Sequence, residues 1–301
     1  MTARARAKRK LIIPFLAPAM LLYAGIIIWP AIQAFNLSLF DWSGFGTSAK
    51  FIAVENFKQL PTDSVFQLAL VNNFVLFVVG GIGIFGFAFL AVSLFPPRAR
   101  GRETFRTLVF LPQVVPLIAL SVLWTFIYNF DFGLLNGFFR LVGLGGLGSI
   151  VWMGPDLIEW AVVLALIWTY AGFYTVLLFS AADRIPDDVL EAAYLEGASR
   201  FQAFRGITLP LIWNVLVIGI VLWIIDAMTQ FDFVFAVGST TGQPRQEIWT
   251  LPIYIFEQAF GQRIPVFRLG YATAMAVALL GLIVVMIVTA RRVLRRPVVE
   301  F

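Results

Sequence analysis

Hydrophobic residues in this chain gather into six stretches, each long enough to cross a lipid bilayer as a helix. A helix needs about 20 apolar residues to cover the hydrocarbon core. The six stretches cover residues 11–34, 66–95, 108–130, 157–182, 211–237 and 270–290. Strands of a membrane barrel would be about ten residues long with alternating polarity. The pattern therefore predicts an all-α integral membrane protein with six transmembrane helices.

The first stretch follows a basic tail, residues 1–10, so it has to be distinguished from a secretory signal peptide. Its apolar run is longer than a typical signal core and contains Pro14 and Pro18. No clear small-residue cleavage site follows it. We therefore expect this stretch to remain in the membrane as an anchor.

Lys and Arg residues are divided unevenly between the two sides of the predicted membrane domain. The two tails, residues 1–10 and 291–301, and the connections 96–106 and 183–208 carry 16 of the 22 basic residues, and the opposite side carries six. Basic residues are retained in the cytoplasm. Both termini are therefore predicted to be cytoplasmic, and the loops 36–65, 131–156 and 239–267 to lie outside.

The composition excludes most kinds of catalytic site. The chain has 60% hydrophobic and 13% charged residues, and it contains neither cysteine nor histidine. Disulfides, Cys/His metal sites, thiol nucleophiles and Ser-His-Asp triads are thereby excluded, and we expect no catalytic residue and no metal site. The net charge of +5 lies in short clusters beside apolar stretches, so membrane orientation explains it better than nucleic-acid binding.

Two glycine-rich segments match the spacing of a dinucleotide-binding motif. Residues 81–86 lie inside a predicted span and residues 143–148 in an outer loop, whereas the motif requires a preceding strand and an open helix N-terminus. No lysine follows a glycine, so a phosphate-binding P-loop is also absent. Close helix packing is the better interpretation of the first segment, which contains Gly80, Gly81, Gly83 and Gly86.

The connection formed by residues 185–210 reads as two short helices. Pro186 followed by Asp187 and Asp188 is typical of a helix start. Gly197 is expected to end that helix, and Ser199 to cap the next one. Helical spacing puts Leu190, Ala193, Tyr194 and Gly197 on one face, leaving a small-residue surface at Ala192 and Ala193. Another protein could approach this surface closely, although an amphipathic hairpin at the membrane surface is an alternative.

The same loop resembles the EAA motif of ABC importer permeases. The match consists of Glu191-Ala192-Ala193, Gly197 and Ile207-Thr208-Leu209-Pro210. The resemblance implies that residues 187–206 form a coupling helix that inserts into a groove of a cytoplasmic ATPase. The residues it assigns to ATPase coupling are Asp187, Glu191, Ala192, Ala193, Glu196, Gly197 and Pro210. Glu196 departs from the Asp that is common in sugar permeases, but the charge is kept.

Further segments resemble the maltose-type (MalF-like) sugar permeases over most of the chain. They are Asp41-Trp42, Val54-Glu55-Asn56-Phe57, Leu111-Pro112, Gly133 with Asn136, and Leu269-Gly270-Tyr271-Ala272. The outer segment 241–244, Thr-Gly-Gln-Pro, departs from the usual Gly-Gly-Pro. The resemblance implies the transmembrane domain of a MalF-type (type I) ABC importer in a bacterial or archaeal plasma membrane.

The resemblance also implies partners and cofactors. The chain would pair with a second related permease, two copies of an ABC ATPase and an extracytoplasmic solute-binding protein, and it would contact membrane lipid but no nucleic acid. ATP and Mg would be bound by the ATPase, so no cofactor is expected in this chain.

Ionisable groups inside a span are candidates for function, and the fifth span contains Asp226 and Asp232. Alignment without gaps onto the maltose-type permeases puts Trp223, Asp226 and Gln230 where that family lines its sugar site. The same exercise selects Trp168, Tyr170 and Phe173 in the fourth span. Aromatic faces with a few polar groups suit a sugar. Helix packing of the aromatic residues, or pairing of Asp226 with the partner permease, are the alternatives.

No Lys or Arg lies well inside a predicted span, which favours a neutral sugar or oligosaccharide over an anionic solute. Three other functions compete with this one. The same importer could carry glycerol phosphate or another small solute. An intramembrane enzyme is disfavoured by the missing His and Cys. A homo-oligomeric channel would conduct without ATP or partners.

Overall fold

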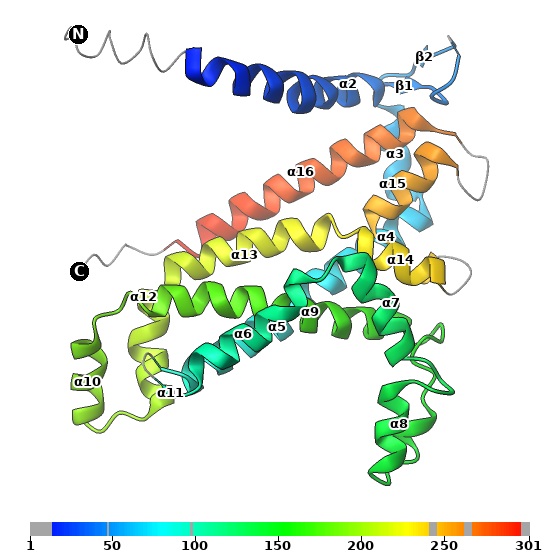
Figure 1. Cartoon of the computed structure of the whole chain (residues 1–301). Coiled ribbons are helices and arrows are strands. Elements are labelled where there is room, and N and C mark those ends of the chain that lie inside the picture. Colours follow the sequence, from blue (N-terminus) through cyan, green and yellow to red (C-terminus); the bar gives the residue numbers. More distant parts are fainter. Residues whose placement is uncertain (1–13, 47, 97–98, 241–245, 262–266, 296–301) are drawn as a thin grey trace, which may run out of the picture. The chain divides into compact units, whose positions relative to one another are not determined.

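The computed structural model describes residues 14–46, 48–96, 99–240, 246–261 and 267–295, and most of them are helical (Figure 1). The tail 1–10, most of the tail 291–301 and the outer segment 241–244 fall outside these residues. The chain divides into two compact units, Met1–Asp63 with Tyr254–Leu280 and Ser64–Ile253 with Gly281–Phe301. Each unit is described by itself.

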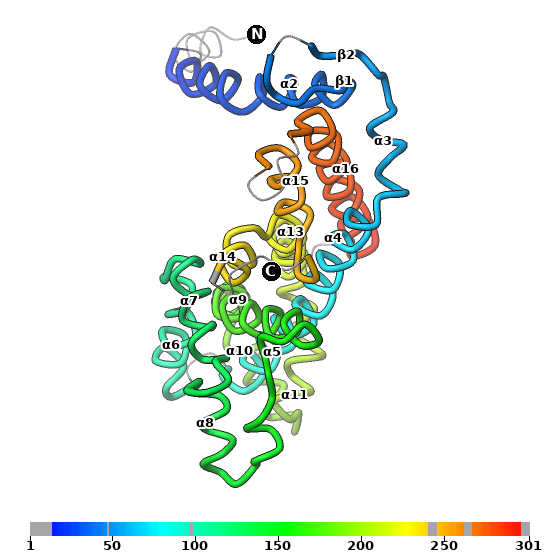
Figure 2. The backbone as a smooth tube through the Cα atoms, turned by 90° about the vertical axis from the view of Figure 1, so that its right-hand side faces the viewer, coloured from blue at the N-terminus to red at the C-terminus, as the bar shows by residue number. Residues whose placement is uncertain are grey.

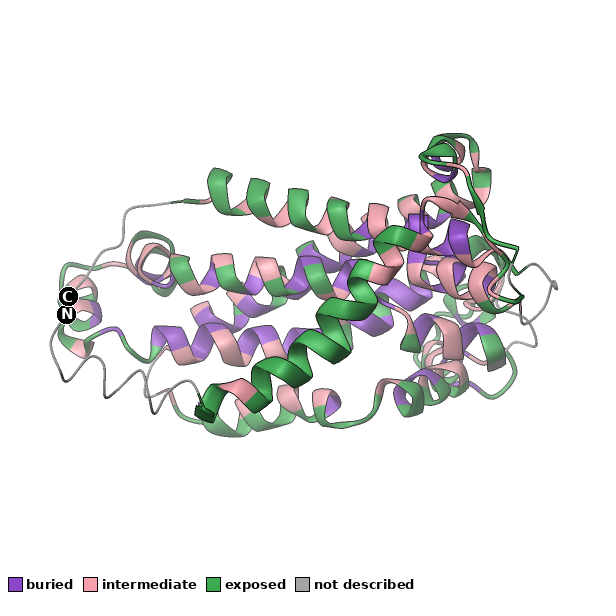
Figure 3. Ribbon diagram, turned by 90° about the horizontal axis from the view of Figure 1, so that it is seen from above, coloured by how far each residue is buried: buried purple, intermediate pink, exposed green. Residues whose placement is uncertain are grey.

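Five helices in the described ranges are long and apolar enough to cross a membrane, as the sequence predicts for an all-α membrane protein. They are Pro14–Leu37, Ser64–Leu94, Ile158–Ala182, Trp213–Ser239 and Leu269–Val293. The first contains no buried residue and is green and pink throughout in Figure 3. Counting the broken helix pair described next as one span gives the six that were predicted.

The third span is not the continuous helix over residues 108–130 that the sequence predicted. It consists of α6 (Arg102–Val114) and α7 (Leu117–Ile127), which meet at 99°. Pro116 causes the break, because its ring disfavours the helical conformation at the preceding residue. Val115 is accordingly extended, with φ −81° and ψ 134°. The helix also begins earlier than predicted, so Arg102 and Arg106 belong to α6 and not to a loop.

The first unit contains short elements beside its spans. A π-helical turn, η1 (Ala24–Ile28), leads into α2 (Trp29–Leu37), and β1 (Phe40–Asp41) pairs antiparallel with β2 (Lys50–Phe51). Then follow α3 (Glu55–Gln59) and η2 (Leu60–Thr62). The helices α15 (Leu251–Phe260) and α16 (Leu269–Val293) each run through a boundary between the units.

A polar cluster holds the first unit together around Asp63. Its Oδ2 atom accepts hydrogen bonds from the hydroxyls of Tyr254, at 2.6 Å, and Tyr271, at 2.7 Å. Burial and the Asp63 carboxylate raise the pKa of Tyr254 above its ordinary value, so this hydroxyl stays protonated and keeps donating. The contact links residues far apart in the sequence.

The second unit is built around α9 (Ile158–Ala182). This helix contacts α5 (Gly81–Leu94), α6 and α13 (Trp213–Met228), which lie on different sides of it in Figure 2. Buried residues occur along its whole length, from Ile158 to Ala182, whereas Trp160, Leu164 and Trp168 are exposed. The remaining core elements are α4 (Ser64–Val75), η3 (Leu76–Gly80) and α14 (Asp232–Thr240).

Smaller elements lie at the two ends of this unit (Figure 1). One end carries α8 (Leu134–Leu141) and η4 (Leu147–Ser149); η6 (Gln246–Ile248) follows α14. The opposite end carries α10 (Asp187–Leu195), α11 (Arg200–Ala203), η5 (Phe204–Thr208) and α12 (Leu209–Leu211). These ends match the outer and cytoplasmic sides assigned by the basic residues.

Glycines let helices approach closely at three of the four positions predicted to do so. A Cβ added at Gly80 or Gly81 would lie 2.8 Å from the Trp223 side chain, and one at Gly83 would collide with Ile167. Gly86 has nothing within 4 Å of such an atom, so the prediction was wrong there. The contacts at Gly80 and Gly81 place Trp223 between α13 and the second span.

Candidate functional site

The cytoplasmic loop begins with a helix whose start follows from its sequence. Pro186 is the N-cap of α10, and Asp187 and Asp188 occupy its first turn. Their carboxylates lie where the helix dipole is positive, which stabilises the start of the helix. The predicted helix start is confirmed.

The turn between α10 and α11 is also specified locally. Gly197 follows the C-cap residue Glu196 and has φ +86°, a left-handed conformation that favours glycine. Ser199 then caps α11: its Oγ accepts from the Gln202 N–H at 3.3 Å, and the Gln202 Oε1 accepts from the Ser199 N–H at 2.7 Å. This reciprocal capping confirms the predicted helix–turn–helix. We call residues 187–203 the cytoplasmic hairpin.

The hairpin buries one side of α10 and exposes the other. Leu190 is buried in an apolar cluster with Ile185 and Phe204. Glu191, Ala192 and Glu196, which the resemblance assigns to coupling, are exposed, and Ala193 is half-buried. The two helices thus present a mixed surface of small and acidic residues to the cytoplasm.

Two exposed apolar side chains on the hairpin were missed by the sequence analysis. Leu195 is 89% exposed and Phe201 is 63% exposed. Exposed apolar patches mark interaction sites, and these two side chains lie on the same hairpin as the residues that the resemblance assigns to coupling. The sequence did contain a signal for the exposure of Leu195, because helical spacing places it off the face of α10 that carries the buried Leu190.

Pro210 does not belong to the exposed hairpin. It lies in α12, after the π-helical turn η5 and just before α13. Its neighbours Leu209 and Leu211 pack against the same apolar cluster as Leu190. Pro210 therefore lies between the hairpin and the fifth span, which begins at Trp213, and it is half-buried.

A second polar cluster joins the fourth and fifth spans. The Tyr174 hydroxyl donates to Asp226 Oδ2 at 2.9 Å, and the Tyr170 hydroxyl lies 3.3 Å from Gln230 Oε1. Trp223 contacts both tyrosine rings edge-on, with centroids 5.6 and 6.1 Å away. The structure therefore brings together Tyr170, Trp223, Asp226 and Gln230 of the predicted pathway residues.

Two predicted pathway residues lie apart from this cluster. Trp168 is on the other side of α9 and packs against Trp124, with centroids 5.5 Å apart. Phe173 contacts only the edge of the cluster, through Tyr174. Residues 168 and 170 are about 200° apart on a helix with 3.6 residues per turn, so these two aromatic side chains cannot share a face.

Burial limits which cluster residues can meet a solute in this conformation. Trp223 is 1% exposed, and its indole N–H donates to the Phe77 carbonyl at 2.8 Å. Trp223 is therefore a buried side chain that packs against the tyrosine rings of the cluster. Gln230 is 4% exposed, and its Nε2 has no hydrogen-bond partner within the described residues. Asp226 is half-buried. An unpaired buried amide is costly, so Gln230 and Asp226 are the groups best placed to meet a ligand or a partner chain.

Tyr174 was missed by the sequence analysis. It lies one helical turn after Tyr170, so the i, i+4 spacing was an available signal.

Within the described residues, no group of three carboxylates lies close enough to hold a metal ion.

Comparisons with known proteins agree with this architecture. Residues 83–298 match the family described as "Binding-protein-dependent transport system inner membrane component". The probable ABC transporter permease protein YurN of Bacillus subtilis is 33% identical over 88% of this chain and 89% of its own length. The diacetylchitobiose uptake system permease protein NgcF of Streptomyces coelicolor is 31% identical over 88% of this chain and 76% of its own length.

Two further matches extend the comparison. The trehalose/maltose transport system permease protein MalF of Thermococcus litoralis is 30% identical over 75% of this chain and 76% of its own length. A chain of a bacterial ABC transporter involved in the import of the acidic polysaccharide alginate has a similar fold, with a TM-score of 0.80 at 20% identity, covering 97% of this chain and 98% of that one.

Proposed function

This chain belongs to the family of binding-protein-dependent transport system inner membrane components, and we propose that it forms half of the translocation pathway of an ABC importer for a neutral sugar or oligosaccharide. As a permease subunit it is a multi-pass protein of a bacterial or archaeal plasma membrane. The proposal concerns its cargo, its partners and the residues that serve them.

The cytoplasmic hairpin is the observation that carries this proposal. Its turn is set by Gly197 and by the capping of Ser199, so its shape does not depend on a partner. Its outer side offers Leu195 and Phe201 beside acidic and small residues. A rigid protrusion with apolar side chains at its tip suits insertion into a groove of a cytoplasmic ATPase.

We propose an assembly with a second related permease, two copies of an ABC ATPase and an extracytoplasmic solute-binding protein. The ATPase would bind ATP and Mg, and this chain would perform no covalent chemistry. Closure of the ATPase pair would displace the hairpin, and the spans would then open toward a loaded binding protein. Alternating access of this kind requires two states that the nucleotide favours differently.

The polar cluster between the fourth and fifth spans supports a sugar as cargo. The carboxylate of Asp226 and the amide of Gln230 are hydrogen-bonding groups beside aromatic rings, which suits the polar edges and apolar faces of a pyranose. Two basic residues at the start of the third span, Arg102 and Arg106, contact Asp183 at the cytoplasmic end. Two of the relatives are named for diacetylchitobiose and for trehalose/maltose uptake, and these sugars are uncharged.

Transport by the reconstituted complex tests this function. The chain would be produced with its partner permease, an ABC ATPase and a solute-binding protein, and the complex would be placed in liposomes. We expect uptake of a neutral oligosaccharide that depends on ATP and on the binding protein. Uptake of glycerol phosphate in its place would change the cargo, and conduction by this chain alone, without ATP, would show a channel instead.

Replacing Asp226 with asparagine is expected to raise the KM for the sugar about tenfold or more, because hydrogen bonds to a charged group contribute about 1.5–3 kcal/mol. The variant keeps the shape of the side chain, removes its charge and replaces one acceptor oxygen with an NH2 donor. Asp232→Asn is the matched control, since Asp232 is exposed in the first turn of α14 and, among the described residues, takes no part in the hydrogen bonds of the cluster. Uptake kinetics in proteoliposomes measure both, and an unchanged KM and rate for Asp226→Asn would remove this residue from the pathway.

A further inference from the structure

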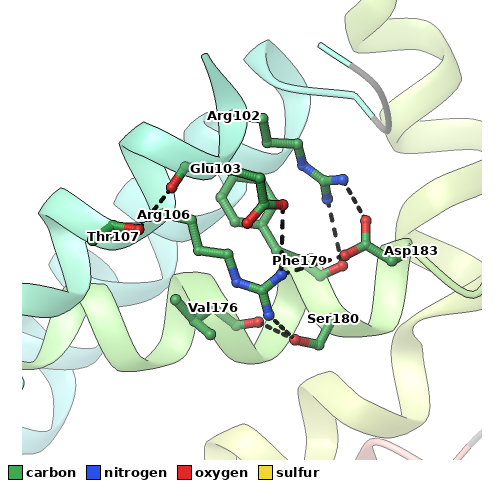
Figure 4. Close-up of polar contacts among 8 residues, drawn as sticks. All are labelled: Arg102, Glu103, Arg106, Thr107, Val176, Phe179, Ser180 and Asp183. Carbon is green, nitrogen blue, oxygen red and sulfur yellow. Dashed lines mark hydrogen bonds and ion pairs between the residues drawn. The ribbon is translucent and has the colours of Figure 1, made fainter. Parts of the chain in front are cut away.

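Three charged residues join the start of α6 to the end of α9 (Figure 4). Arg102 forms an ion pair with Asp183, and its guanidinium lies 4.5 Å from the centre of the Phe179 ring. Arg106 donates to the Ser180 hydroxyl at 2.6 Å, and its Nη1 lies 3.7 Å from Asp183 Oδ2. We call Arg102, Arg106 and Asp183 the ion-pair cluster.

Each charge of the cluster is unfavourable at its own helix end. The two arginines lie in the first turns of α6, where the helix dipole is positive, and Asp183 is the C-cap of α9, where it is negative. The charges therefore stabilise one another across the two helices. The Arg102 side chain is only 8% exposed. A buried ion pair adds little to stability compared with apolar residues of the same size, but breaking it on one side is costly. Its effect is to fix how the two helices are placed.

The cluster lies at the base of the cytoplasmic hairpin. Asp183 is two residues before Ile185, which is buried together with Leu190 of α10 and with Phe179. Phe105 of α6 stacks on Phe95, with ring centroids 4.6 Å apart, and packs against the same apolar cluster. The base of the hairpin, the end of α9 and the start of α6 are therefore one packed body.

Helix α6 continues this body toward the opposite end of the unit. A Cβ added at Gly172 of α9 would overlap the Val109 carbonyl, so the two helices touch there through their backbones. Beyond this contact the span bends at Pro116. A groove of about 960 Å³ lies on that bend, and it is lined by apolar residues that include Leu111, Val115 and Trp168.

The second half of the broken span packs against the helix that follows the polar cluster. Helix α7 contacts α14, which begins two residues after Gln230. A displacement of α6 at its cytoplasmic end is therefore carried through the bend to the outer part of the unit. A rigid element with a bend can move in this way where a continuous helix would only tilt.

We propose that the ion-pair cluster makes α6 follow the cytoplasmic hairpin, so that Arg102, Arg106 and Asp183 are positioning residues that couple ATP hydrolysis to movement of the broken third span. This inference rests on the proposed function, because it assumes that an ATPase moves the hairpin. It assigns a role to the third span that the hairpin alone does not have.

Replacing Asp183 with asparagine tests this role through the number of solute molecules carried per ATP. We expect hydrolysis by the complex to stay within about twofold and the transport-to-ATP ratio to fall about tenfold, the size of effect found for residues that carry coupling. Arg102→Gln should act alike, and the double variant should be no worse than either single one, because both remove the same interaction. Arg184→Gln, which removes the neighbouring exposed charge, should leave the ratio unchanged.

A covalent substitute for the cluster provides the second test. The chain has no cysteine, so Arg106→Cys with Ser180→Cys places two thiols across the α6–α9 contact while Arg102 and Asp183 stay in place. The transport-to-ATP ratio should fall in this variant and return when a short bis-thiosulfonate reagent bridges the thiols. A bridge that restores nothing would overturn the inference.

The outcomes separate this inference from the function on which it rests. Wild-type complex without ATP-driven uptake would contradict the proposed function itself. Normal wild-type uptake with an unchanged ratio in Asp183→Asn, or with hydrolysis and transport lost together, would overturn only the role of the cluster.

Discussion

Replacing Gly197 with aspartate is expected to abolish ATP-driven uptake while leaving the spans inserted in the membrane. Gly197 has φ +86°, which strains any residue with a Cβ, although nothing lies within 4 Å of the added atom. The new charge would lie beside Glu196 on the surface that we propose enters the ATPase. Backbone strain of about 1–3 kcal/mol and a charge left unpaired in an interface, about 2–5 kcal/mol, together predict a loss of about 100-fold or more.

Two measurements test the effect of Gly197→Asp. Uptake in proteoliposomes reports coupling, and co-purification of the ATPase reports docking. Gly143→Asp is the matched control, because Gly143 follows α8 with φ +81° and equally open space, but in an outer loop. It should retain the ATPase. Normal uptake by Gly197→Asp, or equal loss of the ATPase in both variants, would contradict the docking assignment.

Replacing Gly172 with alanine is expected to destabilise the protein more than a Cβ added at any of the other helix glycines described above. The added Cβ would overlap the carbonyl oxygen of Val109, so α6 and α9 have to separate. Overpacking of a close contact lowers the free energy of unfolding by about 1–3 kcal/mol. At Gly172 the added atom meets backbone atoms, so no side chain can move aside to relieve the clash. We expect a cost at the upper end of this range.

Gly86→Ala is the control for this prediction. Gly86 also lies within a long helix, but nothing is within 4 Å of an added Cβ. Alanine favours a helix over glycine by about 1 kcal/mol, so this variant should be neutral or slightly stabilising. Thermal unfolding of the purified complex in detergent compares the two. Equal midpoints would show that α6 and α9 do not touch at Gly172.

The sequence by itself determined those features that depend on local chemistry or on the total of apolar residues. The spans follow from hydropathy, because about 20 apolar residues have no other stable place than lipid. The cytoplasmic hairpin follows from Pro186, Gly197 and Ser199, each of which acts on its own turn of backbone. Pro116 carried a signal for the broken span as well, but proline is tolerated in many membrane helices, so its position alone did not decide between a kink and a bend of 99°.

Only the tertiary structure decided which faces of the spans meet. A helix in lipid is apolar on every side, so periodicity does not show its inner face, as it does in a soluble protein. Trp168 and Tyr170 therefore looked equally suited to a pathway, although they point in different directions. The ion pair between Arg102 and Asp183 joins residues 81 positions apart, and no local rule connects them. The ion pair depends on the approach of α6 to α9, whose backbones touch at Gly172, and a contact between backbones leaves no pattern in the side chains.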